Sequence, residues 1–113
     1  MEIEFTPYTI TINPGPLTNR KRLFTTQNFI DMTKLRNALD GRPSVIEEPP
    51  SGWILQKEGK VCYVIGDGNH RLGLAAVDGN SIELRIIGVW DNRSNVYRFN
   101  NIIQKVRQEL GHR

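Results

Sequence analysis

The stretch VCYVIGDGNHRLGLAA, residues 61–76, decides the fold. Its first five residues are apolar on both faces, which is typical of a central strand. Two glycines, an acid, an amide, a histidine and an arginine follow within six residues, and Leu72, Ala75 and Ala76 then recur at helical spacing. We therefore expect a strand, a tight polar loop and a short helix that ends at Gly79, a residue suited to a left-handed cap.

Further strands and helices are predicted on either side of this stretch. Residues 53–55 should pair with 61–65 in a hairpin that turns at Gly59. Three further strands are predicted at residues 3–12, 45–47 and 82–89. The first of them is interrupted at Pro7 and ended by residues 13–16. Two further helices are predicted, one from Thr25 or Thr26 to Leu39, stopping at Gly41, and one over residues 95–110. The predicted order is β-α-β-β-α-β-α, a small mixed α/β (α+β) domain with a mixed sheet and three main helices.

Composition restricts the protein to a few broad classes. A chain of 113 residues with 38% hydrophobic and 24% charged residues suits one globular domain. The net charge of +3 fits phosphate-bearing partners but is far below that of a dedicated nucleic-acid arm. Cys62 stands alone inside an apolar strand, so we expect a core residue and no disulfide framework or zinc site. Without a signal or membrane-spanning pattern, we expect a cytoplasmic protein with no membrane partner.

The glycines and the arginine of the loop suggest a site for an anion. Gly66 and Gly68 let the backbone bend and approach a ligand closely. The first N–H groups of the following helix lack partners within the helix, and together with the helix dipole they favour a phosphate. Arg71, in the first turn, could hold phosphate oxygens with two hydrogen bonds.

The remaining polar residues of the loop fit nucleotide chemistry. Asp67 is the obvious ligand for a phosphate-bound Mg²⁺, and Asn69 could support it. His70 could donate to a phosphate or carry a proton near neutral pH. A purely structural interpretation stays open beside this one, in which the glycines shape a turn, Asp67 caps the helix, His70 makes a structural hydrogen bond and Arg71 is solvated.

The sequence DGNHRL at residues 67–72, between an apolar strand and a small-residue helix, resembles the ParB/sulfiredoxin superfamily. The likeness covers roughly residues 17–90 and includes the strand that begins at Ile82. The resemblance implies that Gly68, Asn69, His70 and Arg71 contact nucleotide phosphates and that Asp67 helps to hold Mg²⁺.

Two upstream residues enter through the same resemblance. Arg22 lies where family members often have a functional arginine, and Glu47 is the candidate for a carboxylate that completes a kinase site. The family pattern is broken at Asn69, where sulfiredoxins have a cysteine, so we expect no reductase activity. The DNA-partition proteins of the same superfamily have at this position a glutamate that is important for nucleotide turnover.

Three functions are compatible with the sequence. The first is a nucleotide-binding domain for nucleoside tri- or diphosphates. If the domain also turns the nucleotide over, the expected activity is an Mg²⁺-dependent hydrolase or phosphotransferase in which His70 and Glu47 act catalytically. The second is a DNA- or RNA-binding, or nuclease-like, module. The basic run at residues 19–22 could grip either a triphosphate or a nucleic-acid backbone. The third is a phage or mobile-element accessory protein, with the amphipathic helix 95–110 as a docking face for a protein partner or a homodimer.

Overall fold

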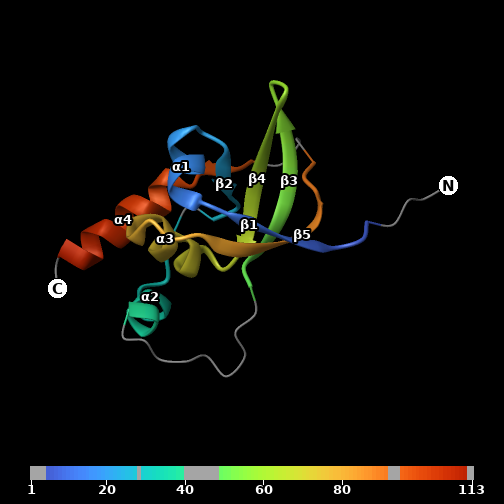
Figure 1. Ribbon diagram of the computed structural model, residues 1–113. Coiled ribbons are helices and arrows are strands. Elements are labelled where there is room, and N and C mark those ends of the chain that lie inside the picture. Colours follow the sequence, from blue (N-terminus) through green and yellow to red (C-terminus); the bar gives the residue numbers. More distant parts are fainter. Residues whose placement is uncertain (1–4, 28, 40–48, 92–94, 112–113) are drawn as a thin grey trace.

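A computed structural model describes residues 5–27, 29–39, 49–91 and 95–111, which form a mixed α+β fold (Figure 1). Six strands and four helices lie within these residues. In chain order they are β1 (Tyr8–Ile12), α1 (Pro14–Asn19), β2 (Leu23–Thr25), α2 (Met32–Leu39), β3 (Ser51–Lys57), β4 (Lys60–Asp67), α3 (Asn69–Asp78), β5 (Ile82–Val89), β6 (Tyr97–Arg98) and α4 (Asn100–Gly111). None of the described helices combines the length and apolar content needed to cross a bilayer.

The strands form one mixed sheet in the order β1-β5-β3-β4-β2-β6. The β3–β5 and β2–β4 pairs are parallel, and the other neighbouring pairs are antiparallel. The predicted hairpin is confirmed, because β3 and β4 pair around the turn at Gly59. The predicted central strand is also confirmed, since β4 lies between β3 and β2.

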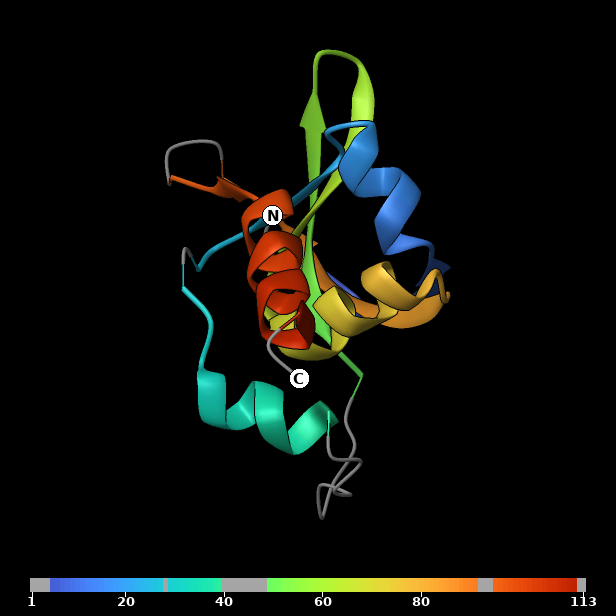
Figure 2. The same ribbon diagram turned by 90° about the vertical axis from the view of Figure 1, so that its left-hand side faces the viewer.

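The main core lies between the sheet and the helices α1, α3 and α4, which cover one of its faces (Figure 2). Leu72 of α3 and Ile102 and Val106 of α4 are fully buried there against Ile65 of β4. Gly73 lets α3 and α4 approach closely, because a Cβ at this position would lie 3.0 Å from Val106. Leu72 and Ala76, two of the residues whose spacing predicted an apolar face on α3, are buried in the core.

A smaller apolar cluster is formed by Phe24, Leu55, Cys62 and Val64. Cys62 alternates along β4 with Tyr63 and Ile65, which belong to the main core, so this cluster lies on the opposite face of the sheet. Cys62 is buried, as expected of a core residue, and burial raises the pKa of its thiol.

The structure differs from the sequence prediction near residues 13–26. The segment expected only to end the first strand contains α1, where Pro14 occupies the first turn, a position that needs no backbone donor. The helix predicted from Thr25 or Thr26 begins instead at Met32, and Asp31 caps it by accepting hydrogen bonds from the N–H groups of Thr33 and Lys34. Thr25 belongs to β2, which pairs with β4.

The last helix also begins later than predicted. Residues 97–98 form the edge strand β6 against β2, and α4 starts at Asn100 rather than at residue 95. The sequence predicts the first strand over residues 3–12. Of the described residues in this range, only those from Tyr8 onward form a strand. The predicted strand 45–47 and the predicted helix stop at Gly41 lie outside the described residues.

Candidate functional site

The predicted loop joins the end of β4 to the start of α3, as the sequence indicates. Gly68, between these elements, has a φ of 85°, in the left-handed region that favours glycine. A Cβ at Gly68 would lie 2.6 Å from Cβ of Pro50, and one at Gly66 would lie 2.6 Å from the ring of Trp53. Both glycines are therefore required by close packing inside the protein, whatever the loop binds.

Asn69, the first residue of α3, is directed into the protein. Its side chain is only 2% exposed, and its Oδ1 accepts a hydrogen bond of 2.7 Å from the buried hydroxyl of Thr25. The Thr25 hydroxyl in turn accepts a hydrogen bond of 3.1 Å from the backbone N–H of Gln27. This buried chain of hydrogen bonds fixes the start of α3 to the end of β2.

His70 connects the start of α3 to the start of α2. Its Nε2 accepts a hydrogen bond of 2.9 Å from the backbone N–H of Asp31, the residue that caps α2. Burial lowers the pKa of His70 below its ordinary value, and the ammonium group of Lys34 acts in the same direction, against the opposing effects of Asp31 and Asp67. The lowered pKa favours the neutral imidazole. The hydrogen bond agrees with this, because an Nε2 that accepts a hydrogen bond carries no proton.

Asp67 is exposed, and Arg71, like His70, is half-buried. Oδ1 of the exposed Asp67 accepts a hydrogen bond of 3.0 Å from the N–H of Gly68. Arg71 is half-buried and forms no hydrogen bond or ion pair with the described residues. Because Arg71 lies in the first turn of α3, its guanidinium is available to an anion at the start of that helix.

The described residues contain no group of three or more histidine, cysteine, aspartate or glutamate side chains able to hold a metal ion. Mg²⁺ is commonly held by one or two carboxylates together with phosphate oxygens of a substrate. Asp67 could supply one carboxylate, so the loop fits Mg²⁺ only as a companion of a bound phosphate.

The other two predicted site residues are not brought to this loop by the described structure. Arg22 precedes β2, whose parallel pairing matches Leu23 with Tyr63, so Arg22 lies roughly 15 Å along the strand direction from Asp67. Its charge instead acts on Cys62, whose pKa it lowers against the larger effect of burial. Glu47 lies outside the described residues.

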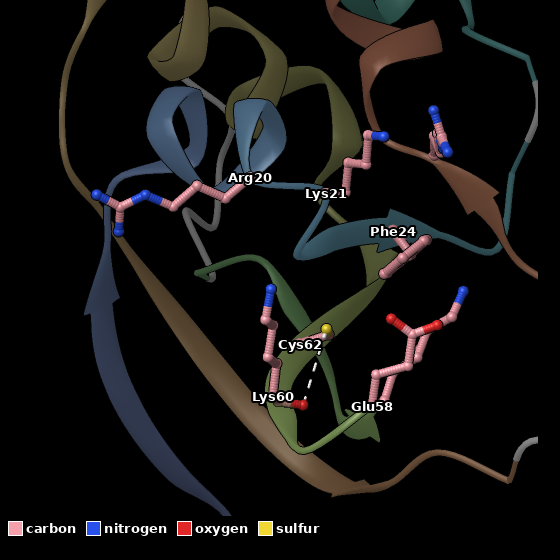
Figure 3. Close-up of a pocket in the computed structure, with 8 residues that line it drawn as sticks. Arg20, Lys21, Phe24, Glu58, Lys60 and Cys62 are labelled. Carbon is pink, nitrogen blue, oxygen red and sulfur yellow. Dashed lines mark hydrogen bonds between the residues drawn. The ribbon is translucent and has the colours of Figure 1, made fainter.

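A cationic pocket, which no local sequence pattern predicts, lies at the opposite end of β4 from the loop. Its cavity of about 300 Å³ is lined by Arg20, Lys21, Phe24, Lys57, Glu58, Lys60, Cys62 and Arg98. Figure 3 shows Lys60 extending from the hairpin toward the turn that carries Arg20 and Lys21, with Cys62 beside it. The basic run at residues 19–22 is the part of this pocket that is visible in the sequence. The other cations of the pocket are distant from it in the chain and come close to it through strand pairing.

Comparisons of this chain with protein-family models, with curated proteins and with solved structures found no match. The functional assignment therefore depends on the geometry and chemistry of the chain itself.

Proposed function

We propose that the protein binds the phosphate groups of a nucleotide at the N-terminus of α3. The observation that carries this proposal is the uncapped start of that helix. Gly68 provides no capping side chain, and within the described residues the N–H groups of residues 69–71 have no hydrogen-bond partner. These three N–H groups, the positive end of the helix dipole and the Arg71 guanidinium together favour an anion at one place.

The residues around the helix start divide into those that contact the ligand and those that position the backbone. In this proposal Arg71 grips phosphate oxygens, and the backbone N–H groups supply the remaining donors. Asn69 acts differently from the expectation based on the resemblance, since its buried side chain is engaged by Thr25 and holds the helix start in place. His70, with Nε2 occupied by the Asp31 N–H, offers Nδ1–H as a neutral donor.

Mg²⁺ enters this proposal as a companion of the phosphates. Asp67 would hold the ion together with phosphate oxygens and water, and the ion would neutralise charge on the phosphates. The proposed hydrolase or phosphotransferase activity has His70 and Glu47 as its candidate proton carriers. His70 would have to release the Asp31 N–H before its Nε2 could accept a proton. Binding is thus the part of the proposal that the described residues support directly.

Calorimetric titration with ATP, CTP and GTP, with Mg²⁺ and with EDTA, tests the proposal. We expect micromolar binding, and Arg71→Ala should weaken it by roughly 10- to 100-fold, because a hydrogen bond to a charged group contributes about 1.5–3 kcal/mol. Arg107→Ala, which removes the same charge from an exposed position on α4, is the matched control and should leave affinity unchanged. Asp67→Asn should remove the effect of Mg²⁺.

Two results would contradict the proposal. One is the absence of nucleotide binding by protein whose circular dichroism shows that it is folded. The other is an equal loss of affinity in Arg71→Ala and Arg107→Ala, which would indicate a general charge effect rather than a site at the start of α3.

A further inference from the structure

We propose that the cationic pocket binds the phosphate backbone of a nucleic-acid duplex. The pocket is built by segments that are distant in the sequence: the turn after α1, strand β2, the β3–β4 hairpin and strand β6. It lies roughly 20 Å from the start of α3, estimated from the rise along β4 between Lys60 and Asp67. This second site does not depend on the proposed nucleotide site.

The charge of the molecule is concentrated at this pocket. Five cationic side chains and one carboxylate, Glu58, line it, so its formal charge is +4, whereas the whole chain carries +3. The described residues outside the pocket carry seven cationic and six acidic side chains, so they are close to neutral. All five cations belong to exposed residues: Arg20, Lys21, Lys57, Lys60 and Arg98. Such a one-sided distribution favours a polyanion, which gains attraction from several cations at once.

The backbone holds these cations in a fixed frame. Lys21 adopts a φ of 59°, and its N–H donates to the carbonyl of Thr18, which closes the turn after α1. The next residue, Arg22, accepts a hydrogen bond of 2.9 Å from the N–H of Tyr63, so the turn is attached to β4. Pairing of Phe24 with Arg98 brings the last cation to the same region.

The apolar surface of the pocket does not suit a nucleobase. Phe24 is only 6% exposed, and the ammonium group of Lys57 lies 5.1 Å from the centroid of its ring. Cys62, the other apolar lining residue, is 3% exposed. Proteins that bind single strands or free bases usually provide an open aromatic face for stacking. This pocket offers charge without such a face, which favours recognition of phosphates alone.

The shape of the protein around the pocket also suits a duplex. The β3–β4 hairpin extends beyond the body of the sheet (Figure 1), and residues 56–61 at its tip are all exposed. Lys57 and Lys60 pair across the ribbon next to its turn. A two-stranded ribbon fits the major groove of B-form DNA, where flanking cations can reach phosphates on both sides.

The experiment measures fluorescence anisotropy of a labelled 20-base-pair DNA duplex as protein is added, at several salt concentrations. Non-specific binding through phosphates gives dissociation constants of about 10⁻⁶–10⁻⁴ M, and each neutralised phosphate adds about −0.9 to the slope of log K against log salt. We expect a slope of about −3 to −4. The double variant Lys60→Gln/Arg98→Gln should weaken binding roughly tenfold at low salt and reduce the slope by about two.

A matched double variant, Arg85→Gln/Arg107→Gln, removes the same charge from exposed positions that do not line the pocket. It should bind the duplex within about twofold of the unmodified protein, since neutralising a charge away from the contact changes only long-range attraction. A duplex RNA arm shows whether the backbone of either nucleic acid is accepted. Arg71→Ala should leave duplex binding unchanged, which separates this site from the proposed nucleotide site.

Three results would overturn the inference. The first is the absence of duplex binding at low salt by the folded protein. The second is an equal loss of affinity in the pocket variant and the matched variant. The third is one-to-one binding of inorganic tripolyphosphate that needs Lys60 and Arg98 while neither duplex competes for it, which would make the pocket a site for small polyphosphates.

Discussion

Gly68 and Gly79 flank α3 and allow its packing to be tested by one matched pair of substitutions. Both have a positive φ, 85° and 73°, so replacement by alanine imposes the left-handed conformation on a residue with a Cβ, at about 1–2 kcal/mol. The surroundings differ, because a Cβ at Gly79 meets nothing within 4 Å, whereas one at Gly68 would lie 2.6–2.9 Å from atoms of Pro50. Overpacking of this kind costs about a further 1–3 kcal/mol.

We therefore expect Gly79→Ala to lower the free energy of unfolding by about 1–2 kcal/mol and Gly68→Ala to lower it by about 2–5 kcal/mol. Urea denaturation followed by circular dichroism measures both values, and an unchanged m-value would show that the unfolded state is not altered. Gly59→Ala in the hairpin turn is a second control, with a φ of 75° and open space around its Cβ. Equal losses at all three glycines would refute the close contact between Pro50 and the loop.

Two further predictions concern the residues that hold the start of α3. Asn69→Ala should lower the free energy of unfolding by about 1–3 kcal/mol, because the buried Thr25 hydroxyl loses its acceptor. A double-mutant cycle with Thr25→Val, measured by urea denaturation, should give a coupling energy of about 1 kcal/mol. A coupling energy of zero would show that the hydrogen bond contributes nothing. Folding lowers the pKa of His70 below its unfolded value of about 6.5. The contribution of this histidine to stability is therefore fully present above about pH 6.5, and it declines as the pH falls from there toward the pKa of the folded state. His70→Gln should flatten this decline in unfolding measurements between pH 5 and 7.5, and an unchanged pH profile would contradict the role of the imidazole.

The strands and helices with strong periodic signals were predictable from the sequence. The apolar run before the loop, the hairpin turn at Gly59 and the cap at Gly79 each predict local geometry that the structure contains. The strands that were missed, β2 and β6, are short and depend on distant partners. Strand β2 has only three residues and exists because β4 and β6 pair with it, and no local pattern indicates that pairing.

The candidate site was predictable in place but not in detail. The loop and the free start of α3 follow from the strand, the glycines and the helical spacing around them. The inward direction of Asn69 was not predictable, because it depends on Thr25, which the sequence suggested as a helix cap. The separation of Arg22 from the loop likewise follows from the parallel register of β2 and β4, which the sequence does not specify.

The pairing of β1 with β5 has a consequence for how the chain folds as it leaves the ribosome. Residues 8–12 pair with residues 82–86, so this sheet edge cannot close until residues 82–86 have been synthesised. The β3–β4 hairpin uses neighbouring residues and can form much earlier. Until β5 emerges, β1 has no partner in the native sheet, and such an unpaired strand is open to incorrect pairing and to chaperone binding. Among the described strands, β1 is thus followed by the longest stretch of sequence before a partner strand is synthesised.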